Sequence, residues 1–231
     1  ALTSGANNTM VGYHAGKFIT TGAGNTGLGY GTMDEVPVAA SYNTALGFSA
    51  MGGDSDSNTA SDYNTAVGAY ALNGVMNEAD NNTAIGYQAG TAITTGDNNI
   101  AIGANALDAE TTGNENIAIG KNALGVAANG ELSNVVIGNE AGNAINDAGA
   151  DYNVIIGSGA GQGGTGAMAQ CVAIGLDAMN STAGNAQAGT VAIGSASLTA
   201  LTSGAGNIAI GYQALNEQTD GARNTAIGYQ A

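Results

Sequence analysis

The feature that most constrains the fold is an internal repeat that runs through the whole chain. The glycine in the string Asn82-Thr83-Ala84-Ile85-Gly86 has twelve equivalents, which lie 17 to 21 residues apart. Positions in each repeat are numbered from this marker glycine, which is position 0. A unit this short cannot hold two helices or a four-stranded blade, so each repeat is predicted to form one coil of a solenoid. The thirteen markers are Gly12, Gly29, Gly47, Gly68, Gly86, Gly103, Gly120, Gly138, Gly157, Gly175, Gly194, Gly211 and Gly228.

Side chains alternate around the marker with a period of two. Position −3 is β-branched and position −1 is aliphatic in all thirteen repeats, whereas position −4 is mostly Asn and position −2 mostly Ala. Such alternation is typical of a strand, and so much glycine disfavours a helix. The sequence therefore predicts an all-β fold, a parallel β-solenoid (β-roll) of about 13 coils of 17–19 residues. Each coil is expected to hold one strand, a second short extended segment after the Ala at position +3, and a turn.

The sequence leaves open which strand face lies inside the coil. If the β-branched and aliphatic face points outward, it forms an apolar stripe larger than soluble monomers usually expose. That face is therefore either the interior of the coil or an interface between chains.

The Asn residues at position −4 are predicted to form a structural ladder, because stacked amides in register can hydrogen-bond along the solenoid. Cys171, the only cysteine, occupies the same position, so no disulfide can form within the chain and a structural role is predicted for its thiol. The ladder residues are Asn8, Asn25, Asn43, Asn64, Asn82, Asn99, Asn116, Asn134, Asn153, Asn207 and Asn224.

Composition excludes several classes of partner. Eighteen Asp and Glu against three Lys and Arg give a net charge of −15. Nucleic acids and anionic bilayers are bound through basic clusters, so neither is an expected partner. No apolar run approaches the ~18 residues of a membrane-spanning helix, so direct membrane insertion is not expected.

Candidate chemistry is sparse. With one His, one Cys and carboxylates scattered over turns, we expect no enzyme and no cofactor. The longest interval contains Asp54, Asp56, Asn58 and Asp62, a weak calcium candidate, since oxygen ligands suit this ion. The sixth and twelfth positions of a calcium loop hold Thr59 and Thr65 instead of Gly and Glu, which favours a solvated acidic turn.

Two further rows suggest partners. Aromatic residues at position +1 serve either as packing or as an exposed row that binds a receptor protein or a glycan. Threonine occupies position −3 in the first five repeats, which suggests an ice-binding solenoid as one alternative function. The aromatic residues are Tyr13, Tyr30, Phe48, Tyr87, Tyr212 and Tyr229.

Strings such as Asn116-Ile117-Ala118-Ile119-Gly120 resemble the YadA-like head repeats of trimeric autotransporter adhesins. The unit Asn224-Thr225-Ala226-Ile227-Gly228-Tyr229-Gln230-Ala231 is similar to β-roll repeats that precede endosialidase-type chaperone domains in phage tail fibres. The resemblance covers the whole chain. It implies a left-handed β-roll, a homotrimer packed around its aliphatic stripes, and a place on a cell or virion surface.

Residues 1–231 are accordingly predicted to form a single solenoid repeat domain. The chain begins and ends within a coil, so a segment of a longer fibre or an end-to-end stacking subunit is expected. The predicted function is a structural or adhesive shaft or head segment of an extracellular fibre, either a surface adhesin or a tail fibre. A self-assembling extracellular filament subunit is a second alternative.

Overall fold

The computed structural model describes residues 4–35, 39–53, 59–126, 130–143, 145, 149–163, 168–180 and 187–231. The chain divides into two compact units, an N-terminal unit Ala1–Asn114 and a C-terminal unit Glu115–Ala231. Each unit is a run of the same repeated coil. No helix capable of spanning a membrane occurs in the part of the chain that the structure describes.

Each repeat contributes one three-residue strand at positions −3 to −1. The strands of the N-terminal unit are β1 (Thr9–Val11), β2 (Thr26–Leu28), β3 (Thr44–Leu46), β4 (Thr65–Val67), β5 (Thr83–Ile85) and β6 (Ile100–Ile102). Those of the C-terminal unit are β7 (Ile117–Ile119), β8 (Val135–Ile137), β9 (Val154–Ile156), β10 (Val172–Ile174), β11 (Val191–Ile193), β12 (Ile208–Ile210) and β13 (Thr225–Ile227). The described residues contain no helix.

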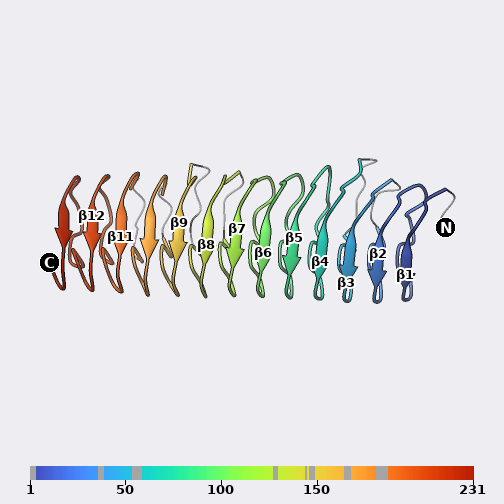
Figure 1. Ribbon diagram of the computed structural model, residues 1–231, viewed down its shortest axis with the longest axis horizontal. Coiled ribbons are helices and arrows are strands. Elements are labelled where there is room, and N and C mark those ends of the chain that lie inside the picture. The colour runs from blue at the N-terminus through green and yellow to red at the C-terminus, as the bar shows by residue number, and fades with distance from the viewer. Residues whose placement is uncertain are drawn as a thin grey trace. The chain divides into compact units, whose positions relative to one another are not determined.

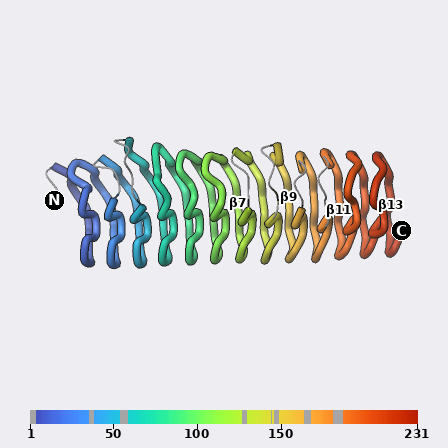
Figure 2. The backbone as a smooth tube through the Cα atoms, turned by 180° about the vertical axis from the view of Figure 1, so that it is seen from behind, coloured from blue at the N-terminus to red at the C-terminus, as the bar shows by residue number. Residues whose placement is uncertain are grey.

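Within each unit the strands lie side by side in chain order and all run parallel (Figure 1). Equivalent positions pair, as Thr44 does with Thr65 and Leu46 with Val67. The backbone outside the strands pairs in the same way: the Gly47 N–H donates to Leu28 O at 3.0 Å and the Ser49 N–H to Tyr30 O at 2.9 Å. Within each unit, a coil is one narrow loop of chain stacked on the next (Figure 2). The expected all-β parallel solenoid is confirmed.

The interior of the coil is lined by small side chains. Ala45, Ala66 and Ala84 at position −2 are at most 1% exposed, and the Asn residues at position −4 are buried beside them. The residue at position +4, such as Leu72 or Leu107, fills the remaining space. The β-branched and aliphatic side chains at positions −3 and −1 therefore point outward, which answers the question of strand orientation.

The expectation of a second extended segment in each coil is wrong. Positions +2 and +4 adopt left-handed backbone conformations, for example Gln88 with φ 55° and Leu107 with φ 52°. Two left-handed residues so close together form a turn, and the turn brings the side chain at position +4 into the interior. Each described coil therefore has one short strand, and the rest of its described backbone is turns, bends and irregular segments, with single bridge residues at Asn114 and Leu132.

Candidate functional site

The outward sheet face of the C-terminal unit is aliphatic. In β7–β12 both outward positions hold Ile or Val, and each of these side chains is at least partly exposed. The strands alternate in burial, because the central residue of each points into the coil. Equivalent positions pair from strand to strand, so the exposed side chains form two parallel aliphatic rows.

The outward sheet face of the N-terminal unit has a different composition. In β1–β5 the threonines at position −3 point outward, beside an aliphatic row at position −1. The aliphatic side chains are well exposed, with Leu28 at 48% and Leu46 at 43%. The ice-binding hypothesis for this threonine row stays a prediction.

The aromatic residues at position +1 form exposed stacks. Tyr13 stacks on Tyr30 with ring centroids 5.4 Å apart, and Tyr30 stacks on Phe48 at 5.3 Å. Tyr70 continues the row with edge contacts to Phe48 and Tyr87. The stacked rings cover each other's faces, so this row offers ring edges and hydroxyl groups to a partner. In the C-terminal unit Tyr212 and Tyr229 stack at 5.3 Å.

Sequence reasoning missed two aromatic contributions. Tyr70 lies one position after the expected column, where Ala69 stands. Tyr42 and Tyr63 at position −5 stack with centroids 5.1 Å apart and are 57% and 56% exposed. Both tyrosines stand at the same position of neighbouring repeats, so an alignment of the repeats would have predicted that they lie side by side.

The Asn side chains at position −4 bond from coil to coil. Asn64 Nδ2 donates to Ala79 O at 2.8 Å, and Asn64 Oδ1 accepts from the Asn82 N–H at 2.8 Å. Direct amide–amide bonds also occur, as from Asn153 Nδ2 to Asn134 Oδ1 at 2.9 Å. Each internal Asn thus satisfies backbone groups of the next coil that no water can reach.

The described ladder is interrupted at Cys171 and Thr190. The Cys171 thiol, buried in the column, donates to Gln187 O at 2.8 Å, and burial raises the pKa of this thiol. The buried Thr190 Oγ1 has no hydrogen-bond partner among the described residues. A thiol with this burial and a raised pKa is a poor nucleophile.

Carboxylates occupy position −6 in three successive repeats of the N-terminal unit. The Ser41 N–H donates to Asp62 Oδ1 at 2.7 Å, and the Asp80 N–H donates to Asp97 Oδ1 at 2.8 Å. The Asp62 N–H likewise donates to Asp80 Oδ1 at 2.6 Å. Burial, together with the charges of Asp62, Asp97 and Glu78, raises the pKa of Asp80, although the hydrogen bond from Asp62 lowers it.

We expect Asp80→Asn to stabilise the fold at neutral pH, by about 0.5 kcal/mol, since it removes like-charge repulsion. Asn114 already fills this position in the unit and accepts from the Asp97 N–H at 2.7 Å, so the bond is retained. Because the folded-state pKa of Asp80 is raised, the wild-type chain gains stability as pH falls through that pKa. The advantage of the variant should therefore shrink with falling pH and disappear below about pH 4.

Urea unfolding of both chains between neutral and acidic pH measures this difference. Asp220→Asn on an exposed turn changes the net charge equally and should leave the free energy of unfolding within about 0.3 kcal/mol of wild type. An Asp80→Asn advantage that stays constant down to acidic pH would show that charge repulsion is not its cause.

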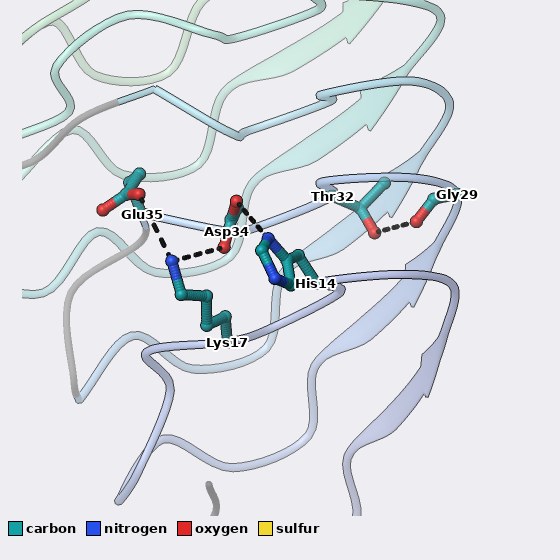
Figure 3. A network of polar contacts seen from close by, with 6 residues as sticks. All are labelled: His14, Lys17, Gly29, Thr32, Asp34 and Glu35. Carbon is teal, nitrogen blue, oxygen red and sulfur yellow. Dashed lines mark hydrogen bonds and ion pairs between the residues drawn. The ribbon is translucent and has the colours of Figure 1, made fainter.

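The only described ion pairs lie together near the start of the chain (Figure 3). His14 Nδ1 lies 3.5 Å from Asp34 Oδ2, and Lys17 Nζ lies 3.8 Å from Asp34 Oδ1 and 4.0 Å from Glu35 Oε1. These partly exposed pairs join two successive coils and are worth little individually.

The weak calcium candidate is not assembled by the described residues. Asp54, Asp56 and Asn58 lie outside the part that the structure describes, and Asp62 Oδ1 accepts a backbone hydrogen bond. Among the described residues no group of three His, Cys, Asp or Glu side chains is placed to hold a metal ion.

Two buried glutamates were also missed. Glu110, fully buried, stands at position +7, where Ile19 and Ile93 stand in other repeats, and its Oε1 accepts from the Thr112 and Gly113 N–H groups. Glu131 is equally buried at position −7, which holds Gly, Ala or Ser in most repeats. Comparing repeats column by column would have identified both.

Comparison with known proteins adds no relative from which a function could be transferred. No family model matches the chain, and neither a curated protein nor a solved structure does.

Proposed function

We propose that this chain is a structural and adhesive segment of an extracellular fibre, and that it self-associates as a homotrimer. The observation that carries the proposal is the outward Ile and Val face of β7–β12. These six parallel strands, about 4.8 Å apart, extend over roughly 24 Å, and the two aliphatic rows run over that length. Exposed apolar surface of this kind marks an interaction site.

The best-matched occupant of this face is a second copy of the chain. The face repeats once per coil, and another copy repeats with the same spacing, so every contact recurs along the unit. In a threefold arrangement the −3 row of one copy packs against the −1 row of the next, which gives a closed heterologous ring. The number three is supported by the resemblance to trimeric adhesin heads and tail-fibre repeats.

Sedimentation equilibrium tests the proposal. The wild-type chain should sediment at three times its mass of 22.3 kDa, and Ile137→Lys with Ile156→Lys should give the monomer, because each buries a charge in the interface. Ser195→Lys is the matched control and should remain trimeric, since Lys121 already occupies that position in another repeat. A wild-type monomer at micromolar concentration would refute the homotrimer, and species that grow without limit would favour the filament alternative.

A further inference from the structure

The outward sheet face of the N-terminal unit carries no charged side chain. It consists of positions −5, −3, −1 and +1 in the six repeats of β1–β6, and these positions hold Tyr, Phe, Leu, Ile, Val, Thr, Asn, Ala or Gly. Its aromatic side chains are 46% to 64% exposed, with Phe48 at the lower and Tyr13 at the upper end. Protein interfaces have such a centre, depleted of charge and enriched in tyrosine.

One edge of this face is acidic along β4–β6. Asp62, Asp80 and Asp97 at position −6 lie directly beside position −5, which holds Tyr63 in the same coil as Asp62. None of the three carboxylates forms an ion pair with a described residue. The N-terminal unit as a whole has ten Asp and Glu residues against one Lys.

These charges decide which partner fits. A second copy laid on this face in parallel would bring equal rows of carboxylates together, and like charges directly opposite are unfavourable. A partner whose apolar surface is bordered by Lys and Arg would pair with the carboxylates while its aliphatic side chains cover Leu28 and Leu46.

The shape of the face decides which structure fits. Flat sheets pack face to face about 10 Å apart with their strands nearly aligned. Six strands about 4.8 Å apart and four outward columns about 6.6 Å apart give roughly 600 Å², near the roughly 800 Å² that each partner buries in a typical stable complex.

We propose that the outward sheet face of β1–β6 binds a partner protein through a β-sheet surface that has an apolar centre and a border of Lys and Arg. This inference rests on the proposed adhesive function and names its partner class. It assigns receptor binding to the N-terminal unit, whereas self-association is assigned to the C-terminal unit.

The test uses the full chain and a designed β-hairpin peptide with Leu and Val on one face and Lys at its other positions. The same hairpin with Glu in place of Lys is the charge control. We expect the Lys hairpin to bind at least about tenfold more tightly than the Glu hairpin, as followed by fluorescence anisotropy. Its affinity should fall when salt rises from about 50 to about 200 mM.

Leu46→Lys and a control variant in the other unit locate the site. Leu46→Lys should weaken binding of the Lys hairpin by at least about tenfold, whereas Ser195→Lys, which is expected to leave self-association intact, should change it less than about twofold. Thr44→Lys, at an exposed position, repeats the first test without altering an aliphatic side chain.

Each outcome decides a separate point. Equal binding of both hairpins, no binding of either, or unchanged binding to Leu46→Lys and Thr44→Lys would overturn the inference. If the wild-type chain proves monomeric but the hairpin still binds as described, self-association fails and the inference stands. If the chain is trimeric and the hairpin does not bind, the reverse holds.

Discussion

Replacing Gly68 with alanine is expected to lower the free energy of unfolding by about 4 kcal/mol or more. Gly68 is a marker glycine of the N-terminal unit, and its φ of +130° lies in a region that only glycine occupies readily. A Cβ atom there would lie 2.4 Å from Gly86 O and 2.7 Å from Gly86 C, so it would collide with the backbone of the next coil. Relieving the collision requires the two coils to move apart.

That movement would break hydrogen bonds on both sides of the residue. The Gly68 N–H donates to Leu46 O and the Gly86 N–H to Val67 O, each at 2.8 Å. The same short approach recurs at Gly47 and Gly86, whose added Cβ atoms would lie 2.6 and 2.5 Å from the next marker's carbonyl oxygen. The marker is therefore glycine for two reasons, its backbone conformation and the close approach of the neighbouring coil.

Gly228→Ala separates these two reasons. Gly228 has a similar φ, +142°, but an added Cβ would meet only the Ala231 Cβ, at 3.7 Å, which is an ordinary contact. Gly228→Ala should therefore lower the free energy of unfolding by about 2 kcal/mol, the cost of the backbone conformation alone. Chemical denaturation followed by far-ultraviolet circular dichroism measures both variants. Equal losses would mean that the close approach between coils is not as the structure has it.

The invariance of the marker made most of the fold predictable from the sequence. Thirteen aligned copies fix where each strand lies, and the alternation around Ile85 or Val135 identifies two opposite faces. Which face points inward could not be predicted, because Ala84 and Ile85 are both apolar and the inward position also holds fully buried Val136 and Ile155 in other repeats. The structure buries Ala84 completely and leaves Ile85 39% exposed.

The candidate site was only partly predictable for a similar reason. The aromatic column at position +1 is visible in the sequence, but Tyr70 extends the stack from the next position, where the backbone has φ 60°. A left-handed backbone conformation at a tyrosine is uncommon, and it cannot be predicted from a single sequence. The acidic border at position −6 becomes meaningful only when the outward orientation of the neighbouring columns is known.

The second large effect is expected from Asn64→Ala, which should lower the free energy of unfolding by about 3 kcal/mol. Asn64 Nδ2 donates to Asp62 O at 3.0 Å and to Ala79 O at 2.8 Å, and Asn64 Oδ1 accepts from the Asn82 N–H at 2.8 Å. Asn64 is fully buried, and so is Ala79. Alanine would leave one carbonyl and one N–H buried without a partner, at about 1–3 kcal/mol each.

Two further variants show whether the hydrogen bonds are responsible. Asn64→Cys copies the residue found at position 171, where the thiol donates to Gln187 O but accepts hydrogen bonds only weakly. It should therefore cost about half as much as alanine, because the Asn82 N–H loses its strong acceptor. Asn139→Ala is the matched control at an exposed position that holds Ala104 in another repeat, and it should change stability by less than about 0.5 kcal/mol.

Urea unfolding ranks the three variants, and hydrogen exchange locates the damage. The Asn82 amide should exchange faster in Asn64→Ala than in wild type, whereas the amide of Gly157, which donates to Ile137 O in the other unit, should keep its protection. If Asn64→Ala unfolds like Asn139→Ala, the buried amide bonds contribute nothing net and the Asn column would be a packing feature alone. If backbone groups of the next coil depend on the Asn64 side chain, Asn64→Ala should be the least stable variant and Asn64→Cys should be intermediate. Loss of packing volume alone would instead make Asn64→Cys nearly as stable as the wild type.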